Sequence, residues 1–163
     1  MNKVLKLNPI SAGDAEAMLD ILTSKAVAQT YMLPDFEKRE DALPLFGKLM
    51  TLSQEKTRYV RGIYADGSLV GFLNDVEIHN GAIELGYVIH PDHWGKGFMT
   101  GALRLAIDDL FRLEYREVVC GAFAQNRAST RVMEKAGMTR INKVEDIEYR
   151  GQVHLCVYYS IQK

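Results

Sequence analysis

Three consecutive segments in the middle of the chain limit its possible folds more than any other feature. The run AIELGYVIH (82–90) reads as a strand, residues 98–111 have the period of an amphipathic helix, and EVVCGAF (117–123) is a short, continuously apolar strand. A continuously apolar strand is typical of a position buried on both faces. A strand-helix-strand unit of this kind favours a mixed sheet with helices packed on it.

The remaining segments extend this unit on both sides. Strand patterns are expected within 3–10, 57–65 and 68–78, and two more within 138–161 around the turn YRGQ (149–152). Helix patterns occur within 11–24, 38–54 and 126–137, and Asn126 is the expected N-cap of the last one. DGS (66–68) and HNGA (79–82) are turn signals that predict an antiparallel meander. The sequence therefore predicts an α+β fold with a mixed, mostly antiparallel seven-stranded sheet and about four helices.

Length and composition exclude several classes of protein. A chain of 163 residues without linker or repeat fits a single domain over 1–163. A net charge of −1 without a run of Lys and Arg argues against nucleic acid as a partner. No apolar run approaches the roughly 18 residues of a membrane helix, and the first residues do not resemble a signal peptide. Cys120 and Cys156 lie in strand-like runs, so we expect reduced core thiols in a cytoplasmic protein.

The corner between the strand and the helix is the strongest candidate for a binding site. In HPDHWGKGFMTGAL (90–103), Gly95 and Gly97 immediately precede the helical pattern, and Lys96 lies between them. The first N–H groups of a helix lack partners within the helix, and its dipole attracts negative charge there. Such a corner can bind a phosphate or a pyrophosphate. Alternatively, the glycines shape a tight turn and Lys96 is solvated, since the third glycine of the dinucleotide fingerprint is absent.

Two motifs together resemble one family. GYVIHPDHWGKGFMTGALRLAI (86–107) resembles the acetyl-coenzyme A (acetyl-CoA) loop of the GNAT superfamily of N-acetyltransferases, and AQNRASTRVMEKAGM (124–138) is similar to its pantetheine-facing segment. The stretch WGKGFMTGA is closest to the branch of ribosomal-protein N-terminal (alanine/serine) acetyltransferases. Trp94 stands where the general motif has Gln or Arg, and Met99 stands where it has a small residue.

The resemblance implies a GNAT-like fold with a splayed centre between strands 4 and 5, and acetyl-CoA as cosubstrate without a metal. The residues that it places at the cofactor are Val88, Ile89, His90, Trp94, Gly95, Lys96, Gly97, Phe98, Met99, Thr100, Asn126 and Ser129. The expected activity is transfer of an acetyl group to a primary amine by direct attack in a ternary complex.

The resemblance also suggests catalytic residues. Glu148 matches the position of the base in the ribosomal branch, whereas Glu84 alternates with apolar neighbours in its strand; both stay open as the general base. Either could also be structural, since Glu145, Asp146 and Glu148 form an acidic cluster that fits a solvated strand edge. Many family members use a tyrosine acid where this chain has Met133, so Ser129 is the candidate acid. A helix-start hydroxyl that binds the backbone is the alternative for Ser129.

The acceptor is less defined than the cofactor. The resemblance suggests a protein N-terminus, and small amines also fit; a homodimer is common among similar proteins. The pair His90 and His93 is by itself weak evidence for a metal site, so no metal is expected. Met133 also leaves open a second hypothesis, a CoA-binding but catalytically silent sensor or regulatory domain. Turnover with an amine distinguishes the two.

Overall fold

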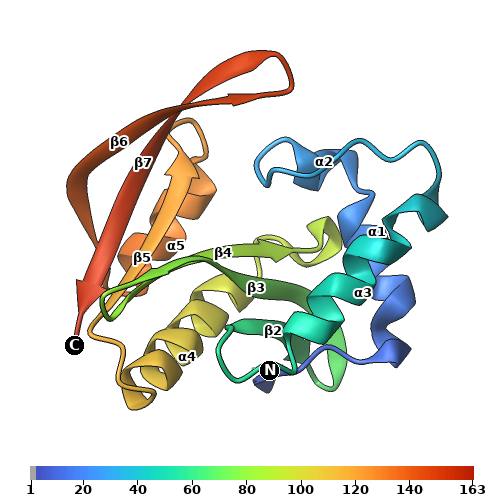
Figure 1. Ribbon diagram of the computed structural model, residues 1–163, viewed down its shortest axis with the longest axis horizontal. Helices are drawn as coiled ribbons and strands as arrows, with labels where there is room; N and C mark the ends of the chain where they lie inside the picture. Colours follow the sequence, from blue (N-terminus) through green and yellow to red (C-terminus); the bar gives the residue numbers. More distant parts are fainter. Residues whose placement is uncertain (1–2) are drawn as a thin grey trace. The chain divides into compact units, whose positions relative to one another are not determined.

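The computed structural model describes residues 3–163, which form one seven-stranded sheet in the order β1-β2-β3-β4-β5-β7-β6 (Figure 1). The strands are β1 (Leu5–Asn8), β2 (Val60–Ala65), β3 (Ser68–His79), β4 (Ala82–Ile89), β5 (Glu117–Phe123), β6 (Thr139–Tyr149) and β7 (Gln152–Gln162). The α-helices are α1 (Ala15–Leu22), α2 (Lys25–Ala28), α3 (Leu43–Leu52), α4 (Phe98–Arg112) and α5 (Arg127–Lys135). The predicted α+β class is confirmed, and the short helix α2 adds to the four longer helices expected from the sequence.

The chain divides into two compact units. The first unit contains the described residues up to Asn74 together with Tyr87–Ala102, and the second contains Asp75–Gly86 and Leu103–Lys163. β3, β4 and α4 contribute residues to both units. The expectation of a single domain over 1–163 stays a prediction.

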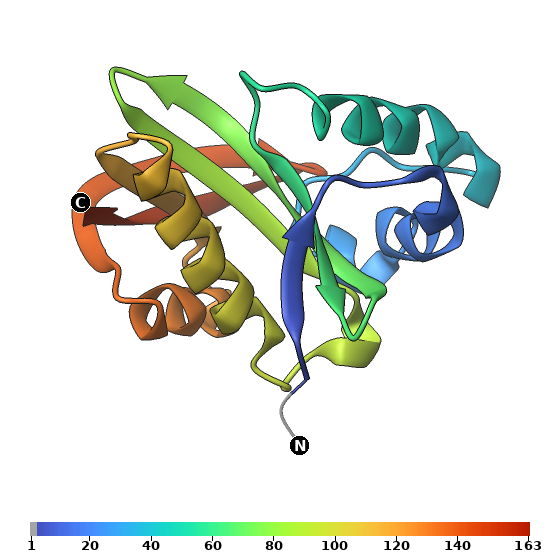
Figure 2. The same ribbon diagram turned by 90° about the horizontal axis from the view of Figure 1, so that it is seen from below.

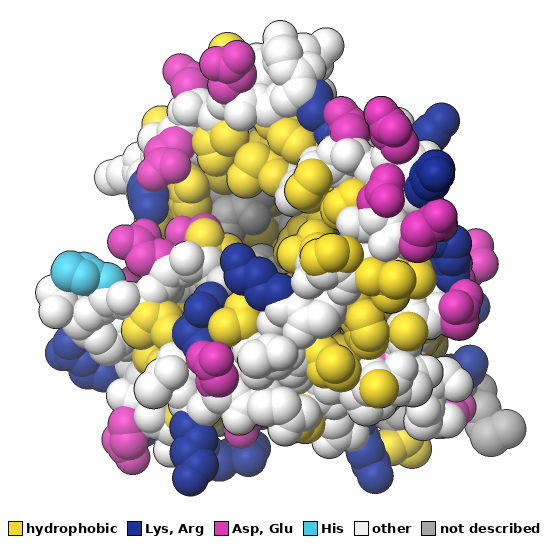
Figure 3. All heavy atoms as spheres, turned by 45° about the vertical axis from the view of Figure 1, so that its right-hand side comes forward, with side chains coloured by type: hydrophobic (Ala, Val, Ile, Leu, Met, Phe, Trp, Pro, Cys, Tyr) yellow, Lys and Arg dark blue, Asp and Glu magenta, His cyan; other side chains and the backbone are white. Residues whose placement is uncertain are grey.

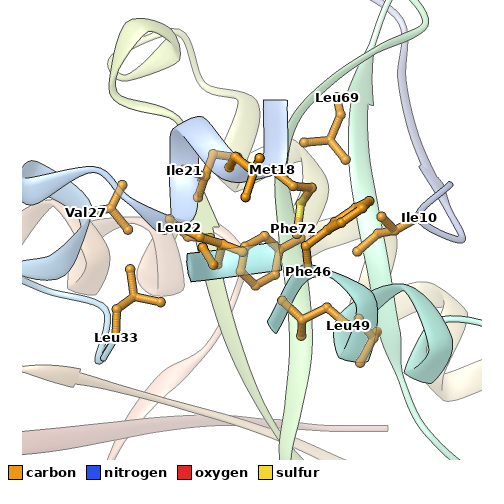
Figure 4. Close-up of a cluster of buried hydrophobic side chains, with 14 of the residues drawn as sticks. Ile10, Met18, Ile21, Leu22, Val27, Leu33, Phe46, Leu49, Leu69 and Phe72 are labelled. Carbon is orange, nitrogen blue, oxygen red and sulfur yellow. The ribbon is translucent and has the colours of Figure 1, made fainter. Parts of the chain in front are cut away.

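In the first unit, β1 pairs antiparallel with β2, and β2 pairs antiparallel with β3 (Figure 2). The helices α1 and α3 supply the apolar side chains that pack on these strands. Phe72 of β3 and Met18 of α1 are completely buried in this core, next to Phe46 of α3 (Figure 4). In α1 the buried residues recur at helical spacing, which is why this segment folds as a helix with one face inward.

The segment 38–54 is less regular than its pattern predicted. Its first turn, Arg39–Ala42, is a 3-10 helix, and α3 begins only at Leu43. Pro44 lies in the first turn of α3, where its missing N–H costs no helical hydrogen bond. The proline therefore determines where the α-helix begins.

In the second unit, β5, β7 and β6 form an antiparallel array with α5 on one face (Figure 1). The hydroxyl of Tyr159 on β7 donates to Glu134 of α5 at 3.0 Å, which shows which face of β7 the helix covers. β4 pairs parallel with β5 over Ala82–Leu85, and the pairing stops there although β4 continues to Ile89. The parallel pair makes the sheet mixed, as the strand-helix-strand unit predicted, and the end of the pairing at Leu85 agrees with the splayed centre expected at strands 4 and 5.

The three hairpin turns have the backbone that their sequences predicted. Each contains two consecutive residues with positive φ, of which the second is Gly67, Gly81 or Gly151. Two successive positive φ values are the requirement of a type I′ turn, which glycine meets without steric cost. Local sequence alone therefore determined these three reversals.

The surface and the cysteines also follow the composition. On the face shown in Figure 3, Lys and Arg side chains are interspersed with Asp and Glu, as the net charge of −1 suggests. Cys120 and Cys156 are buried free thiols, as expected. Within residues 3–163, no helix has both the length and the apolar character needed to cross a membrane.

Candidate active site

The predicted cofactor loop lies in the first unit, between the end of β4 and the start of α4. Gly95 and Gly97 have φ values of +76° and +77°, and a Cβ atom added to either would meet nothing within 4 Å. The positive φ explains why glycine is needed, and the open space leaves the backbone accessible from outside. The carbonyl of Gly97 accepts the first helical hydrogen bond, from the amide of Gly101 at 3.2 Å.

This arrangement leaves free donors at the helix start. Because Gly97 accepts the first helical bond, the amides of Phe98, Met99 and Thr100 precede the first N–H that is bonded within α4. Lys96 is exposed on the same loop and adds a positive charge. α4 has 15 residues, so its dipole reinforces the attraction for an anion. The loop thus fits a pyrophosphate: it offers backbone donors, a cation and the room that two glycines leave.

Trp94 holds the loop to the end of β4. Its indole Nε1 donates to the carbonyl of Ile89 at 2.7 Å, while 52% of the residue is exposed. The tryptophan that replaces Gln or Arg of the general motif therefore has a structural role here, and its exposed part lies at the loop. Its fluorescence can report a ligand bound there.

The end of β4 packs closely on β3. A Cβ atom on Gly71 would lie 2.1 Å from the carbonyl oxygen of Val88, and the amide of His90 donates to the carbonyl of Val70 at 2.8 Å. No other residue fits at Gly71 without moving this strand. The side chains of Val88 and Ile89 are buried, so a cofactor can contact these residues only through their backbone.

The two histidines of the corner have different environments. His90 Nδ1 accepts from the amide of Asp92 at 3.0 Å and so caps the short 3-10 turn Pro91–His93. His93 Nδ1 is buried without a hydrogen-bond partner among the described residues. Burial, and then the charge of Lys96, lower the pKa of His93, which favours its neutral form. Among residues 3–163, no group of three His, Cys, Asp or Glu side chains is placed to hold a metal ion.

The second predicted cofactor segment lies in the second unit, at the start of α5. The Asn126 side chain accepts from the amide of Ser129 at 3.2 Å, which confirms the predicted N-cap. Ser129 is half-buried in the first turn, and Met133 is completely buried one turn later. Met133 is therefore part of the core and offers no group for proton transfer.

The two glutamates proposed as the base lie on opposite faces of the sheet in the second unit. Glu84 pairs with Val119 of β5, and this face continues through Gly121 to Tyr158 of β7. Glu148 pairs with Val153, whose side chain alternates away from that face and is 68% exposed. The acidic cluster of Glu145, Asp146 and Glu148 is therefore divided between the two faces of the sheet.

Only one member of the acidic cluster shares the face of Glu84. Glu145 pairs with Cys156 and accepts from the hydroxyl of Tyr158 at 3.1 Å. Asp146 pairs with Leu155 on the other face, together with Glu148. Burial raises the pKa of Glu84; the charge of Lys143 lowers it, and Glu77 and Glu145 raise it. A raised pKa makes a carboxylate a stronger base, so Glu84 is suited to accept a proton.

Sequence reasoning did not identify Tyr158 or Lys143 as neighbours of this carboxyl. The turn YRGQ predicted the hairpin register near its tip, and the strict alternation from Glu145 to Tyr149 could have separated Glu145 from Glu148. Because the register shifts between Arg140 and Val144, the alternation of side chains could not predict the neighbours of Lys143.

An aromatic cluster lies on the same face, toward the tip of the hairpin. The ring of His154 stacks on Phe123 with 4.4 Å between centroids, and Tyr149 contacts both rings. His154 pairs with Ile147, which is half-buried on this face. The ring of His154 is thus half-buried and packed against Phe123. His79 is the last residue of β3, directly before the β3–β4 turn that HNGA predicted.

Comparison with known proteins shows which family this chain resembles. Residues 5–139 match the model of the acetyltransferase (GNAT) domain. The protein named "Uncharacterized N-acetyltransferase YoaA" of Bacillus subtilis (strain 168) is 28% identical over 166 residues, covering 98% of this chain and 93% of YoaA. "Putative ribosomal N-acetyltransferase YdaF" of the same organism is 37% identical over 106 residues, which are 63% of this chain and 58% of YdaF.

A solved structure supports the fold. The ribosomal L7/L12 alpha-N-protein acetyltransferase RimL, in complex with coenzyme A, superposes with a TM-score of 0.85 at 22% identity. The match covers 97% of this chain and 93% of RimL. The resemblance to the GNAT family drawn from the two sequence motifs is therefore confirmed. Two of the similar proteins, YdaF and RimL, carry names from the ribosomal branch.

Proposed function

Because the chain belongs to the acetyltransferase (GNAT) domain family, we propose that it transfers the acetyl group of acetyl-CoA to a primary amine. The observation that carries the proposal is the open loop at the start of α4, where Gly95 and Gly97 leave room beside free backbone donors. RimL, which has the same fold, is a protein acetyltransferase solved with coenzyme A. We infer that the pyrophosphate of the cofactor binds to the amides of Phe98–Thr100 and to Lys96.

The backbone of Val88–His90 and the side chains of Asn126 and Ser129 are proposed to bind the pantetheine arm. Pantetheine is rich in amide groups, so backbone donors and a carboxamide are suitable partners. Asn126 already caps α5, so its side chain is held in one orientation. A fixed donor loses less entropy on binding than a mobile one.

For the chemistry, three tasks fall to the chain: to take the proton of the amine, to stabilise the oxyanion of the attacked thioester, and to protonate the departing thiolate. We propose Glu84 as the base in preference to Glu148, since it is half-buried and its pKa is raised by burial. Ser129 is proposed as the acid. The acetyl group passes directly from the thioester sulfur to the amine nitrogen in a ternary complex, without a covalent enzyme intermediate.

The acceptor is proposed to be a protein N-terminus or a small primary amine. YdaF and RimL are named as ribosomal or ribosomal-protein acetyltransferases, which supports the first class. The charged groups near Glu84 are two carboxylates, Glu77 and Glu145, and one cation, Lys143, so the excess of negative charge favours a cationic acceptor.

A CoA-binding regulator without activity is the second candidate. It is supported by Met133, which is buried where many family members have a tyrosine acid. The two candidates differ in turnover and not in binding, so one experiment in two stages distinguishes them.

The first stage is a titration with coenzyme A, followed by the fluorescence of Trp94, the single tryptophan of the chain. A saturable change with coenzyme A, absent with adenosine, is expected if the pyrophosphate binds at this loop. The second stage measures release of free thiol from acetyl-CoA with a panel of amines and N-terminal peptides. Binding without thiol release from any acceptor would favour the regulator, and absence of binding would contradict both.

A further inference from the structure

Three side chains on β6 and β7 form a closed set of contacts on the face of Glu84. Lys143 Nζ lies 3.5 Å from the carboxylate of Glu145 and 4.3 Å from the ring centroid of Tyr158. The Tyr158 hydroxyl donates to the other carboxylate oxygen of Glu145 at 3.1 Å. Each residue thus contacts the other two. We call this set the Lys143–Glu145–Tyr158 triangle.

The triangle is anchored to the sheet by Tyr158. Only 4% of Tyr158 is exposed, and a Cβ atom on Gly121 of β5 would lie 2.7 Å from its ring. The ring therefore fits over Gly121 because that residue has no side chain. Burial raises the pKa of Tyr158, with further contributions from Cys156 and from the carboxylate of Glu145, so the hydroxyl stays protonated as a donor. Lys143 and Glu145 are about half exposed, so this buried ring is the rigid part of the triangle.

The triangle lies on the same face of the sheet as Glu84. Glu84 pairs with Val119. Two residues further along β5, Gly121 pairs with Tyr158. Titratable groups that interact with Glu84 come from four strands: Glu77 of β3, Cys120 of β5, Lys143 and Glu145 of β6, and Cys156 and Tyr158 of β7. Burial raises the pKa of both cysteines, so they stay uncharged at neutral pH. The charged groups that remain are Lys143, Glu145 and Glu77, and two of these three belong to the triangle.

We propose that Lys143, Glu145 and Tyr158 are positioning residues for catalysis, which set the pH above which Glu84 can accept the proton of the amine. Lys143 stabilises the carboxylate form of Glu84, and Glu145 opposes it. Tyr158 determines where both charges lie, since it binds Glu145 through its hydroxyl and Lys143 through its ring. This proposal rests on the proposed role of Glu84 as the base.

The test is the pH profile of kcat/KM for one fixed amine, measured for the wild type and for two variants that each remove one charge. Lys143→Gln removes the stabilising cation and leaves Glu145 unneutralised, so the acidic limb of the profile should move to higher pH. Glu145→Gln removes the opposing anion and frees Lys143, so the limb should move to lower pH. For charges at this range, partly screened by solvent, we expect shifts of roughly half a pH unit or more in each direction.

Two further variants distinguish a shift of the pH profile from a general loss of folding. Asp146→Asn changes the same charge at the next position, but Asp146 lies on the opposite face with Leu155, so its profile should match the wild type. Tyr158→Phe keeps the ring over Gly121 and releases Glu145, so the limb should move in the direction of Glu145→Gln by a smaller amount. A loss of folding common to the variants cannot produce shifts of opposite sign.

The outcomes distinguish this proposal from the proposed function. If no amine releases thiol, the enzymatic function itself is wrong. If Glu84→Gln is as active as the wild type, the base is another group and the triangle has no such role. A third outcome is that Glu84→Gln abolishes turnover while Lys143→Gln and Glu145→Gln keep the wild-type profile. The proposed enzymatic function is then supported, and the proposed role of the triangle is overturned. Opposite shifts, with Asp146→Asn unchanged, support it.

Discussion

Replacing Gly97 by alanine tests the cofactor loop most directly, because the structure separates its effect on folding from its effect on binding. The added methyl group meets no atom within 4 Å, so it creates no clash in the free protein. The remaining cost is the backbone, since φ is +77° at Gly97. A non-glycine residue in the left-handed region costs about 1–2 kcal/mol. For a chain of this size, we expect the melting temperature to fall by roughly 2–8 °C.

Binding of coenzyme A should be weakened by more than this backbone strain in the Gly97→Ala variant. The methyl group occupies the open space through which phosphate oxygens would approach the amides of Phe98–Thr100. Losing one hydrogen bond to a charged group costs about 1.5–3 kcal/mol, so the Kd for coenzyme A should rise roughly tenfold or more. At a coenzyme concentration of about 100 times the wild-type Kd, bound ligand stabilises the wild type by about 2.7 kcal/mol and such a variant by about 1.4 kcal/mol or less.

Gly67→Ala is the matched control. Gly67 belongs to the same unit, lies in the β2–β3 turn, has a φ of +86°, and also has no atom within 4 Å of an added Cβ. Both variants should therefore lose similar stability, measured by thermal unfolding without ligand. Only Gly97→Ala should lose the stabilisation by coenzyme A. Equal stabilisation of the two variants by the coenzyme would refute the assignment of the pyrophosphate to this loop.

Two further predictions concern stability. Glu84→Gln should raise the melting temperature at neutral pH and have little effect at about pH 4. The reason is that burial raises the folded-state pKa of Glu84, so its contribution is most favourable at low pH and is lost as pH rises through that pKa; a pH-independent effect would contradict this. Phe72→Ala should lower the free energy of unfolding by about 3–5 kcal/mol in urea denaturation, because Phe72 is completely buried and packs edge-on against Tyr31. A loss below about 1 kcal/mol would mean that the core closes around the missing ring.

Much of the fold could be predicted from sequence because it depends on near neighbours in the chain. The hairpin turns, the N-cap at Asn126 and the two glycines of the cofactor loop each follow from the backbone needs of a few consecutive residues. The same holds for α4, whose apolar period is strong. Where a local feature was missed, as in the 3-10 turn before Leu43, the start of the α-helix moved by a single turn.

Only the pairing of the strands distinguishes between the glutamates that are candidates for the base. In the sequence, Glu145, Asp146 and Glu148 form one acidic cluster, and Glu84 is far away. In the second unit, Glu145 shares a face with Glu84 while its two acidic neighbours point to the other side. A strand alternates its side chains, so a change of register by one residue exchanges every side chain between the faces.

What the sequence determined by itself is thus the order of the elements, the turns between them and the glycine loop that resembles an acetyl-CoA site. The tertiary structure alone decided that Gly71 lets β3 and β4 approach, and that Tyr158 fits over Gly121 and binds Glu145. The physical reason is the range of the interactions. Turns and caps form between residues close in the chain, whereas the contacts of Glu84 depend on the register of strands separated by many residues, including a shift between Arg140 and Val144 that no local pattern indicates.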